Sequence, residues 1–107
     1  MKQGQWLWRS GDQATHVAII VQGQLNLIRR HEGEKELHIA SLRDGDMVGQ
    51  FEVLSETRIF SNIKANQDTI LFIIPATNFI KTEKQDPQLA RNIIREFGLL
   101  MTRTDPT

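Results

Sequence analysis

The residues best suited to bind a ligand lie in one stretch of the chain, from Gly45 to Ala65. Gly45 and Gly49 lie four residues apart, and a short apolar run and then Arg58 follow the second glycine. Glycine has no Cβ and tolerates a positive φ, so its backbone can approach a ligand closely. A short helix that begins after such a glycine presents unpaired N–H groups to an anion, and a nearby arginine suits a phosphate. The pattern predicts a phosphate-binding cassette.

Several side chains of this stretch could contact the ligand, although each also has a purely structural interpretation. Arg58 has the alternative of a solvent-facing turn arginine, and Gln50 that of a cap for the cassette turn. Polar residues of a strand edge need not donate to a ligand either. The candidate ligand-binding residues are Gly49, Gln50, Phe51, Glu52, Arg58, Ser61 and Asn62.

Composition narrows the classes of function. The chain has 107 residues, which is the size of one domain, and its 13 basic and 13 acidic residues cancel. No net field therefore favours nucleic acid or an anionic membrane. The longest apolar runs, Val17–Val21 and Ile70–Pro75, are too short to span a bilayer, and the first residues form no signal peptide. With no cysteine in the chain, we expect a cytoplasmic location.

Nothing in the sequence indicates catalysis. His16, His31 and His38 lack the spacing of metal ligands, and there is no Gly-x-Ser-x-Gly motif or nucleophile with an evident base. We therefore expect no catalytic residue, no metal, no cofactor and no enzyme activity. Another function class is a small cupin-like metalloenzyme, which would also be built on a β-roll. It is disfavoured because the chain lacks the histidine cluster that would bind its metal.

The elements around the cassette have the pattern of a β protein. Glycines at positions 11, 23, 33 and 45 separate short apolar segments, and two of these segments alternate apolar and polar residues. Strands bounded by turn residues every 8–12 residues are typical of a sandwich or barrel. The expected strands include Trp6–Trp8, Val17–Val21, Leu25–Ile28, Leu37–Leu42, Phe60–Ala65 and Thr69–Ile74. Trp6 and Trp8, two residues apart, should share one face as core or rim residues.

Helical signals begin where the strands end. Pro75 should end the last strand, Phe79 and Ile80 should lie in a short helix or turn, and Asp86–Pro87 should start a final helix as N-cap and first position. The sequence thus predicts a single, mainly β domain over 1–107. Its roll of about eight strands, a double-stranded β-helix or jelly roll, covers about 4–75 and carries a short cassette helix. A C-terminal helical part follows over about 76–104.

With these elements in place, the chain resembles a cyclic nucleotide-binding domain of the catabolite activator and protein kinase A regulatory subunit type. Five segments match in order over nearly the whole length, and the most recognisable is the Gly-Asp turn with the apolar pair and glycine after it. The matching segments are Trp6–Asp12, Val17–Leu25, Leu42–Gly49, Ile73–Phe79 and Asp86–Ala90.

The resemblance implies specific roles that this sequence fills only in part. In the family, a glutamate after the cassette glycine accepts a hydrogen bond from the ribose 2′-hydroxyl, and a later arginine pairs with the cyclic phosphate. Here Gln50 takes the place of the glutamate and Ile59 that of the arginine, one residue after Arg58. Since neighbouring strand residues face opposite sides, the Arg58 guanidinium should point away from the pocket unless a bulge or shorter loop restores the register.

Two further residues bear on the same site. Phe60 stands where the family has a small residue, so its ring could fill the space of the phosphate. Glu52 could replace the missing acid only if the short helix turns it inward.

The resemblance leaves two functional hypotheses. The first is a regulatory sensor that binds cAMP or cGMP weakly or conditionally and reports occupancy through its C-terminal helix to an attached effector domain or second subunit. The contacts would come from Ile93, Phe97 and Met101. The alternative is a degenerate domain that binds no nucleotide and serves protein–protein interaction or dimerisation. In either case the start of the chain so close to the first strand suggests a piece of a larger protein.

Overall fold

The computed structural model describes residues 1–30, 36–88, 92 and 95, which form seven strands and two helices. The elements are β1 (Trp6–Trp8), β2 (His16–Gln22), β3 (Gln24–Arg30), β4 (Glu36–Arg43), β5 (Met47–Val48), α1 (Gln50–Ser55), β6 (Asn62–Ala65), β7 (Ile70–Pro75) and α2 (Ala76–Gln85).

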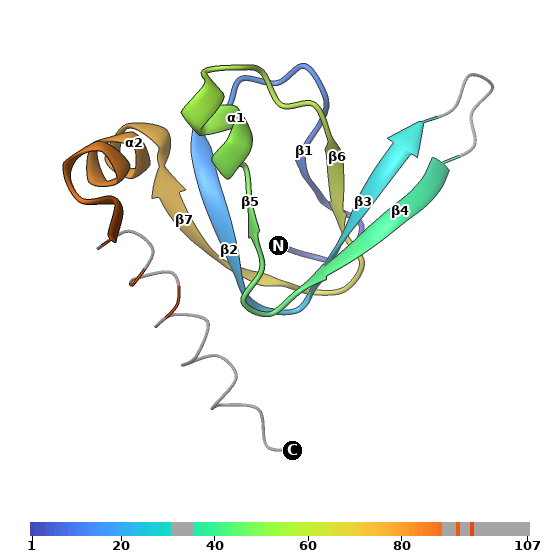
Figure 1. The fold of residues 1–107 in the computed structure, drawn as a ribbon. Helices are drawn as coiled ribbons and strands as arrows, with labels where there is room; N and C mark the ends of the chain where they lie inside the picture. Colours follow the sequence, from blue (N-terminus) through green and yellow to red (C-terminus); the bar gives the residue numbers. More distant parts are fainter. Residues whose placement is uncertain (31–35, 89–91, 93–94, 96–107) are drawn as a thin grey trace.

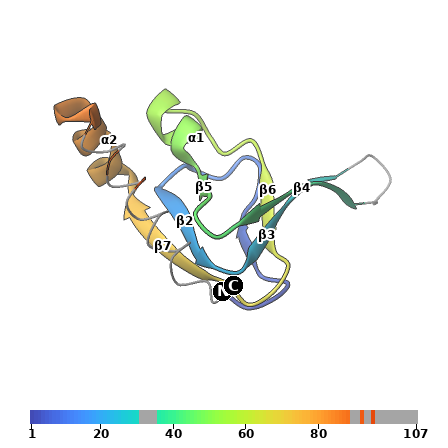
Figure 2. The same ribbon diagram turned by 60° about the horizontal axis from the view of Figure 1, so that its bottom comes forward.

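Two antiparallel sheets face each other and make a β-roll (Figures 1 and 2). One sheet has the order β1-β6-β3-β4 and the other the order β5-β2-β7. The cassette helix α1 closes one end of the roll, and α2 lies outside the second sheet, beside β7 and β2 (Figure 1). The predicted fold class, a mainly β roll with a cassette helix, is therefore confirmed.

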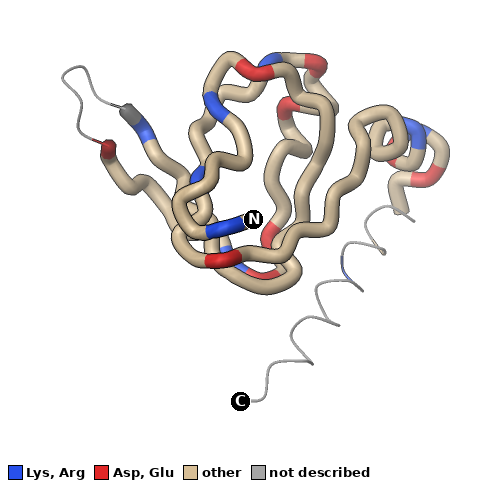
Figure 3. The backbone as a smooth tube through the Cα atoms, turned by 180° about the vertical axis from the view of Figure 1, so that it is seen from behind, with Lys and Arg blue, Asp and Glu red and all other residues tan. Residues whose placement is uncertain are grey.

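Basic and acidic residues are mixed along the backbone of the roll (Figure 3). In the described part of the chain, no helix is long and apolar enough to cross a membrane.

The core follows from the alternation of the strands. Side chains from both sheets fill the inside of the roll, with Ala18 and Ile20 contributed by β2 and Leu25 by β3. Val17 points to the other side of β2, where it packs with Val53 of α1 and Phe79 of α2. Strand β2 thus buries both of its faces, which explains why its apolar run is continuous rather than alternating.

The structure refines the sequence prediction in four places, at the start of β6 and in the C-terminal part of the chain. Strand β6 begins at Asn62, so Phe60 and Ser61 precede it, because Ile59 pairs instead with the 11–12 loop. Phe79 and Ile80 lie in a helix of ten residues, which is the first of the two alternatives expected for them. Asp86 separates α2 from helical residues Pro87 and Gln88. The proposed contact residues Ile93, Phe97 and Met101 lie outside the described residues.

The two tryptophans do not share a face, contrary to the prediction. Trp6 is paired with Lys64 and Trp8 with Ile63, and a register shift separates the two pairs. Such a bulge inserts an extra residue and so reverses the facing of the residues after it. Trp8 is consequently buried in the inner core, whereas Trp6 lies outside, with Arg9 4.8 Å and Lys64 5.1 Å from its ring centroid.

The turn between β2 and β3 depends on Gly23. Its φ is 126°, and a Cβ at this position would come within 2.7 Å of the Cα of Thr69. Thr69 is itself buried and fixed, because its Oγ1 donates to the Gln67 carbonyl at 2.8 Å and accepts from the Gln24 amide at 3.2 Å. The backbone of Thr69 therefore cannot move away from a larger residue.

We expect Gly23→Ala to lower the free energy of unfolding by more than about 2 kcal/mol, because strain at positive φ and a backbone clash add together. Gly11→Ala is the matched control, since Gly11 has φ of 97° but nothing within 4 Å of its Cβ position. The control should lose about 1 kcal/mol from the backbone strain alone. Urea unfolding of the three proteins measures the difference, and equal losses in the two variants would contradict the role of Thr69.

Candidate functional site

The backbone of the cassette has the geometry that the sequence predicts. Gly49 adopts a left-handed conformation, with φ of 93°, immediately before α1 begins. Its carbonyl accepts a hydrogen bond from the Val53 amide at 3.0 Å, which is the first backbone hydrogen bond of the helix. At the other end Glu56 is also left-handed, and its amide caps the carbonyls of Glu52 and Val53.

The space beside Gly49 is filled by a side chain of the protein itself. A Cβ on Gly49 would lie 2.7 Å from Cη2 of Trp8 and 3.0 Å from the carbonyl oxygen of His16. The close approach that the sequence analysis attributed to a ligand is thus made by the Trp8 indole, which is 6% exposed. The glycine is required here for packing, whether or not a ligand is bound.

Two polar atoms near this contact are buried without a hydrogen-bond partner among the described residues. They are Nε1 of Trp8, a donor, and Oε1 of Gln50, an acceptor. Nε1 lies on the same edge of the indole as the carbons that meet Gly49, and Gln50 is the next residue along the chain. A buried polar group left unpaired costs about 1–3 kcal/mol. A hydroxyl, which both donates and accepts, is the simplest group that could pair with either atom.

His16 lies beside the indole of Trp8. Its ring lies 5.4 Å from that of Trp8, and its Nδ1 is 3.0 Å from the Thr15 hydroxyl. Burial beside the indole lowers the pKa of His16 from its ordinary value of about 6.5.

Helix α1 turns its side chains in two directions. Glu52 and Val53 are buried, and Glu52, at 4% exposed, is turned inward as its role as a substitute acid would require. Phe51 and Leu54 point outward, and Phe51 is well exposed. Of the four consecutive candidates from Gly49 to Glu52, Phe51 is thus directed away from the interior.

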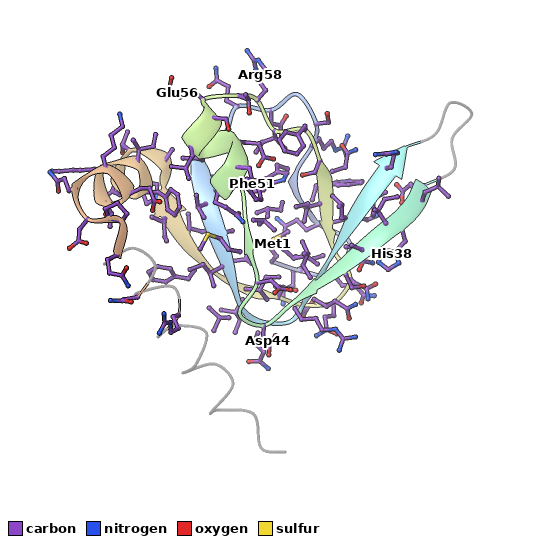
Figure 4. All side chains as sticks on the ribbon, viewed as in Figure 1. Met1, His38, Asp44, Phe51, Glu56 and Arg58 are labelled. Atoms are coloured by element: carbon purple, nitrogen blue, oxygen red, sulfur yellow. The ribbon has the colours of Figure 1, made fainter. Side chains whose placement is uncertain are left out.

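The predicted offset at the arginine position is observed. Ile59 is 1% exposed and belongs to the inner core, whereas Arg58 lies on the outer surface (Figure 4). The Arg58 guanidinium donates from Nη1 to the carbonyl of Gly11 at 3.0 Å. Phe60 does not fill the interior, because 68% of it is exposed.

Ser61 and Asn62 differ in whether their side chains could contact a ligand. The Asn62 amide is already engaged, since Nδ2 donates to the Ile28 carbonyl at 3.2 Å and Oδ1 accepts from the Ser10 amide at 3.0 Å. Ser61 lines an open cavity of about 240 Å³ between β3, β4 and the segment before β6. The other lining residues are Leu27, Ile28, Arg29, Ile39, Phe60 and Asn62.

Two residues of this region were missed by the sequence analysis as site residues. Arg29 lines the cavity, and its position two residues after the inward Leu27 on β3 was a signal that could have identified it. Trp8 was assigned to the core or rim, and no sequence signal shows that its indole meets Gly49. For metals, the described residues contain no group of three His, Cys, Asp or Glu side chains that could hold an ion.

With this geometry established, comparison with known proteins decides the family. The family model for the cyclic nucleotide-binding domain matches residues 1–86. The chain belongs to the cyclic nucleotide-binding domain family. The resemblance carried by the cassette and its flanking strands is therefore confirmed.

A relative and two solved structures show the range of this similarity. The chain is 31% identical over 90 residues to lysophospholipase NTE1 of Phaeosphaeria nodorum, a match that covers 84% of this chain and 6% of that protein. The catabolite activator protein of Thermus thermophilus matches with a TM-score of 0.74 and 23% identity over 98% of this chain and 49% of that one. The regulatory subunit of a cAMP-independent protein kinase A from Trypanosoma brucei gives a TM-score of 0.71 and 18% identity, covering 89% and 35%.

The lowered pKa of His16 makes stability depend on pH. At pH values just below 6.5 the unfolded chain binds a proton that the folded protein does not, so stability falls as the pH drops through this range and levels off below the folded pKa. We expect the stability difference between wild type and His16→Asn to shift against the wild type between pH 7.5 and pH 5. Urea unfolding at several pH values measures it, and a difference that does not change with pH would contradict the burial of a neutral imidazole.

Proposed function

We propose that this domain is a regulatory sensor that binds cAMP or cGMP weakly, in the β-roll beside the cassette. The observation that carries the proposal is the preserved Gly49–α1 backbone combined with the buried, unpaired Oε1 of Gln50. Gln50 takes the sequence position of the family's ribose-binding glutamate, and its oxygen would accept a hydrogen bond from a ribose hydroxyl. Glu52, two residues further along α1, is a second buried polar side chain of the cassette.

The weakness follows from the missing cation. Loss of one partner of a desolvated charge pair costs about 2–5 kcal/mol, which corresponds to roughly 30- to several-thousand-fold in affinity. Ile59 occupies the inward position, and the Arg58 guanidinium is held outside by the Gly11 carbonyl. A site of micromolar affinity would therefore weaken to a dissociation constant between about 30 µM and the millimolar range.

A relay to the C-terminal part has a physical basis in the described residues. Val53 of α1, Phe79 of α2 and Val17 of β2 form one buried apolar cluster. A displacement of the cassette helix on ligand binding would be passed to α2 and so to the chain beyond it. We infer that occupancy is reported along this path to an attached domain or a second subunit.

The output would belong to a larger protein. The chain spans 6% of the length of lysophospholipase NTE1, so a regulatory domain of a long enzyme of that kind is the setting we propose. The catalytic step would lie elsewhere in such a protein, and this domain would contribute control rather than chemistry.

The alternative proposal is a domain that has lost its ligand and serves only protein interaction or dimerisation. The buried Ile59 favours it, as does the match to a kinase subunit described as cAMP-independent. A triple mutant of that subunit, one of whose substitutions introduces an arginine, was solved bound to cAMP. Restoring an inward arginine is therefore a direct way to separate the two proposals.

We expect isothermal titration of the wild type to give a dissociation constant for cAMP or cGMP weaker than about 30 µM. Ile59→Arg should tighten it at least tenfold, because a guanidinium then lies on the inner side of the strand. Arg58→Ala is the matched control and should leave the affinity within about twofold.

No heat and no shift in melting temperature at millimolar nucleotide, for a folded wild-type protein, would reject the sensor and support the interaction domain. A strong loss of affinity in Arg58→Ala would instead show that the outer arginine moves inward when the ligand binds.

A further inference from the structure

We propose that Arg29 is the phosphate anchor of this domain and that Ser61 assists it, in place of the arginine that the cassette lacks. This inference rests on the proposed binding of a cyclic nucleotide and names the residues that hold its anionic group. It assigns the charge to strand β3 rather than to the segment after α1.

The pairing of the sheet brings the two residues close together. Strands β3 and β6 are antiparallel, with Leu27 opposite Ile63 and Ile28 opposite Asn62. Arg29 follows the last of these pairs on β3, and Ser61 precedes it in the segment that leads into β6. Both residues line the same cavity, where one small anion could contact both side chains.

Alternation along β3 shows the side to which Arg29 projects. Ile63 belongs to the inner core and Leu27 packs against it, so the inner side of β3 is fixed at Leu27. Side chains alternate along a strand, so Arg29, two residues after Leu27, projects to the same side of β3. Arg29 is exposed there, at the open end of the roll, and it shares the wall of the 240 Å³ cavity with Ser61.

The cavity supplies chemistry that suits a nucleotide. The Ser61 hydroxyl and the guanidinium offer neutral and charged donors, and the Phe60 and Ile39 side chains give apolar surface at the mouth. Small-molecule pockets usually have about 300–1,000 Å³, so this cavity holds only part of a nucleotide. The phosphate would be bound at the mouth, and the rest of the nucleotide would extend beyond this cavity into the roll.

Three other basic groups of the roll have contacts away from the cavity. Arg58 donates to the Gly11 carbonyl, and Arg9 and Lys64 lie over the outer face of Trp6. Within the described ranges, Arg29 forms no ion pair, and it is the basic residue that lines the cavity. Its guanidinium is thus available to an incoming anion without first breaking a contact to a described residue.

The test compares Arg29→Gln with Arg58→Gln in the full chain, by titration with cAMP at low and high salt. We expect Arg29→Gln to weaken binding at least tenfold and to abolish most of the salt dependence, because the variant removes the charge that attracts the phosphate. Arg58→Gln should stay within about twofold of the wild type at both salt concentrations.

A spectroscopic measurement removes the dependence on the variant's folding. In the wild type, cAMP should shift the backbone amide NMR signals of Phe60 and Ser61 and the Arg29 side-chain signals. If the wild type binds cAMP, while Arg29→Gln binds equally well or the shifts are confined to 49–53, Arg29 is not the anchor and the sensor function stands. If the folded wild type binds no cyclic nucleotide, the sensor function fails first and the anchor fails with it.

Discussion

The contact between Trp8 and Gly49 is the constraint on which the cassette depends. The indole edge occupies the place that a Cβ would take, and the carbonyl of His16 closes the same space from β2. Strand β1, strand β2 and the start of α1 are therefore fixed relative to one another by one residue that has no side chain. Any other residue at position 49 would have to displace a buried ring and also accept a φ of 93°.

This packing changes the meaning of the glycine pattern. In the sequence, a glycine before a short helix indicates an anion cradle, because both the missing Cβ and the helix amides suit a phosphate. In the structure, the missing Cβ serves an aromatic ring, and Ile59 continues the apolar lining on the inner side. The cassette backbone is thus formed around an apolar interior, and Ile59 leaves no inward charge at the position where the family has its arginine.

Most of the fold could be predicted from the sequence because it depends on local signals. Turn glycines and apolar alternation locate the strands, and Asp86–Pro87 locates a helix boundary. The same alternation correctly separates Arg58 from Ile59, since adjacent residues must face opposite sides.

The parts that could not be predicted depend on contacts between distant segments. The bulge that puts Trp6 and Trp8 on opposite sides is set by pairing with β6, more than fifty residues away. The inward direction of Glu52 depends on how α1 docks against the sheet, and the presence of Arg29 and Ser61 in one cavity wall depends on the pairing of β3 with β6. None of these relations leaves a pattern in neighbouring residues, so periodicity and spacing do not reveal them.

A weak ligand limits what the relay can achieve. A ligand shifts an equilibrium only by its difference in binding free energy between two states. At a concentration equal to its dissociation constant, a ligand that binds one state alone stabilises that state by about 0.4 kcal/mol. Since Val53, Val17 and Phe79 form a closely packed buried cluster, α1 and α2 should move together or not at all. A response to such a ligand therefore requires two arrangements of α2 that differ by less than about 1 kcal/mol in the free protein.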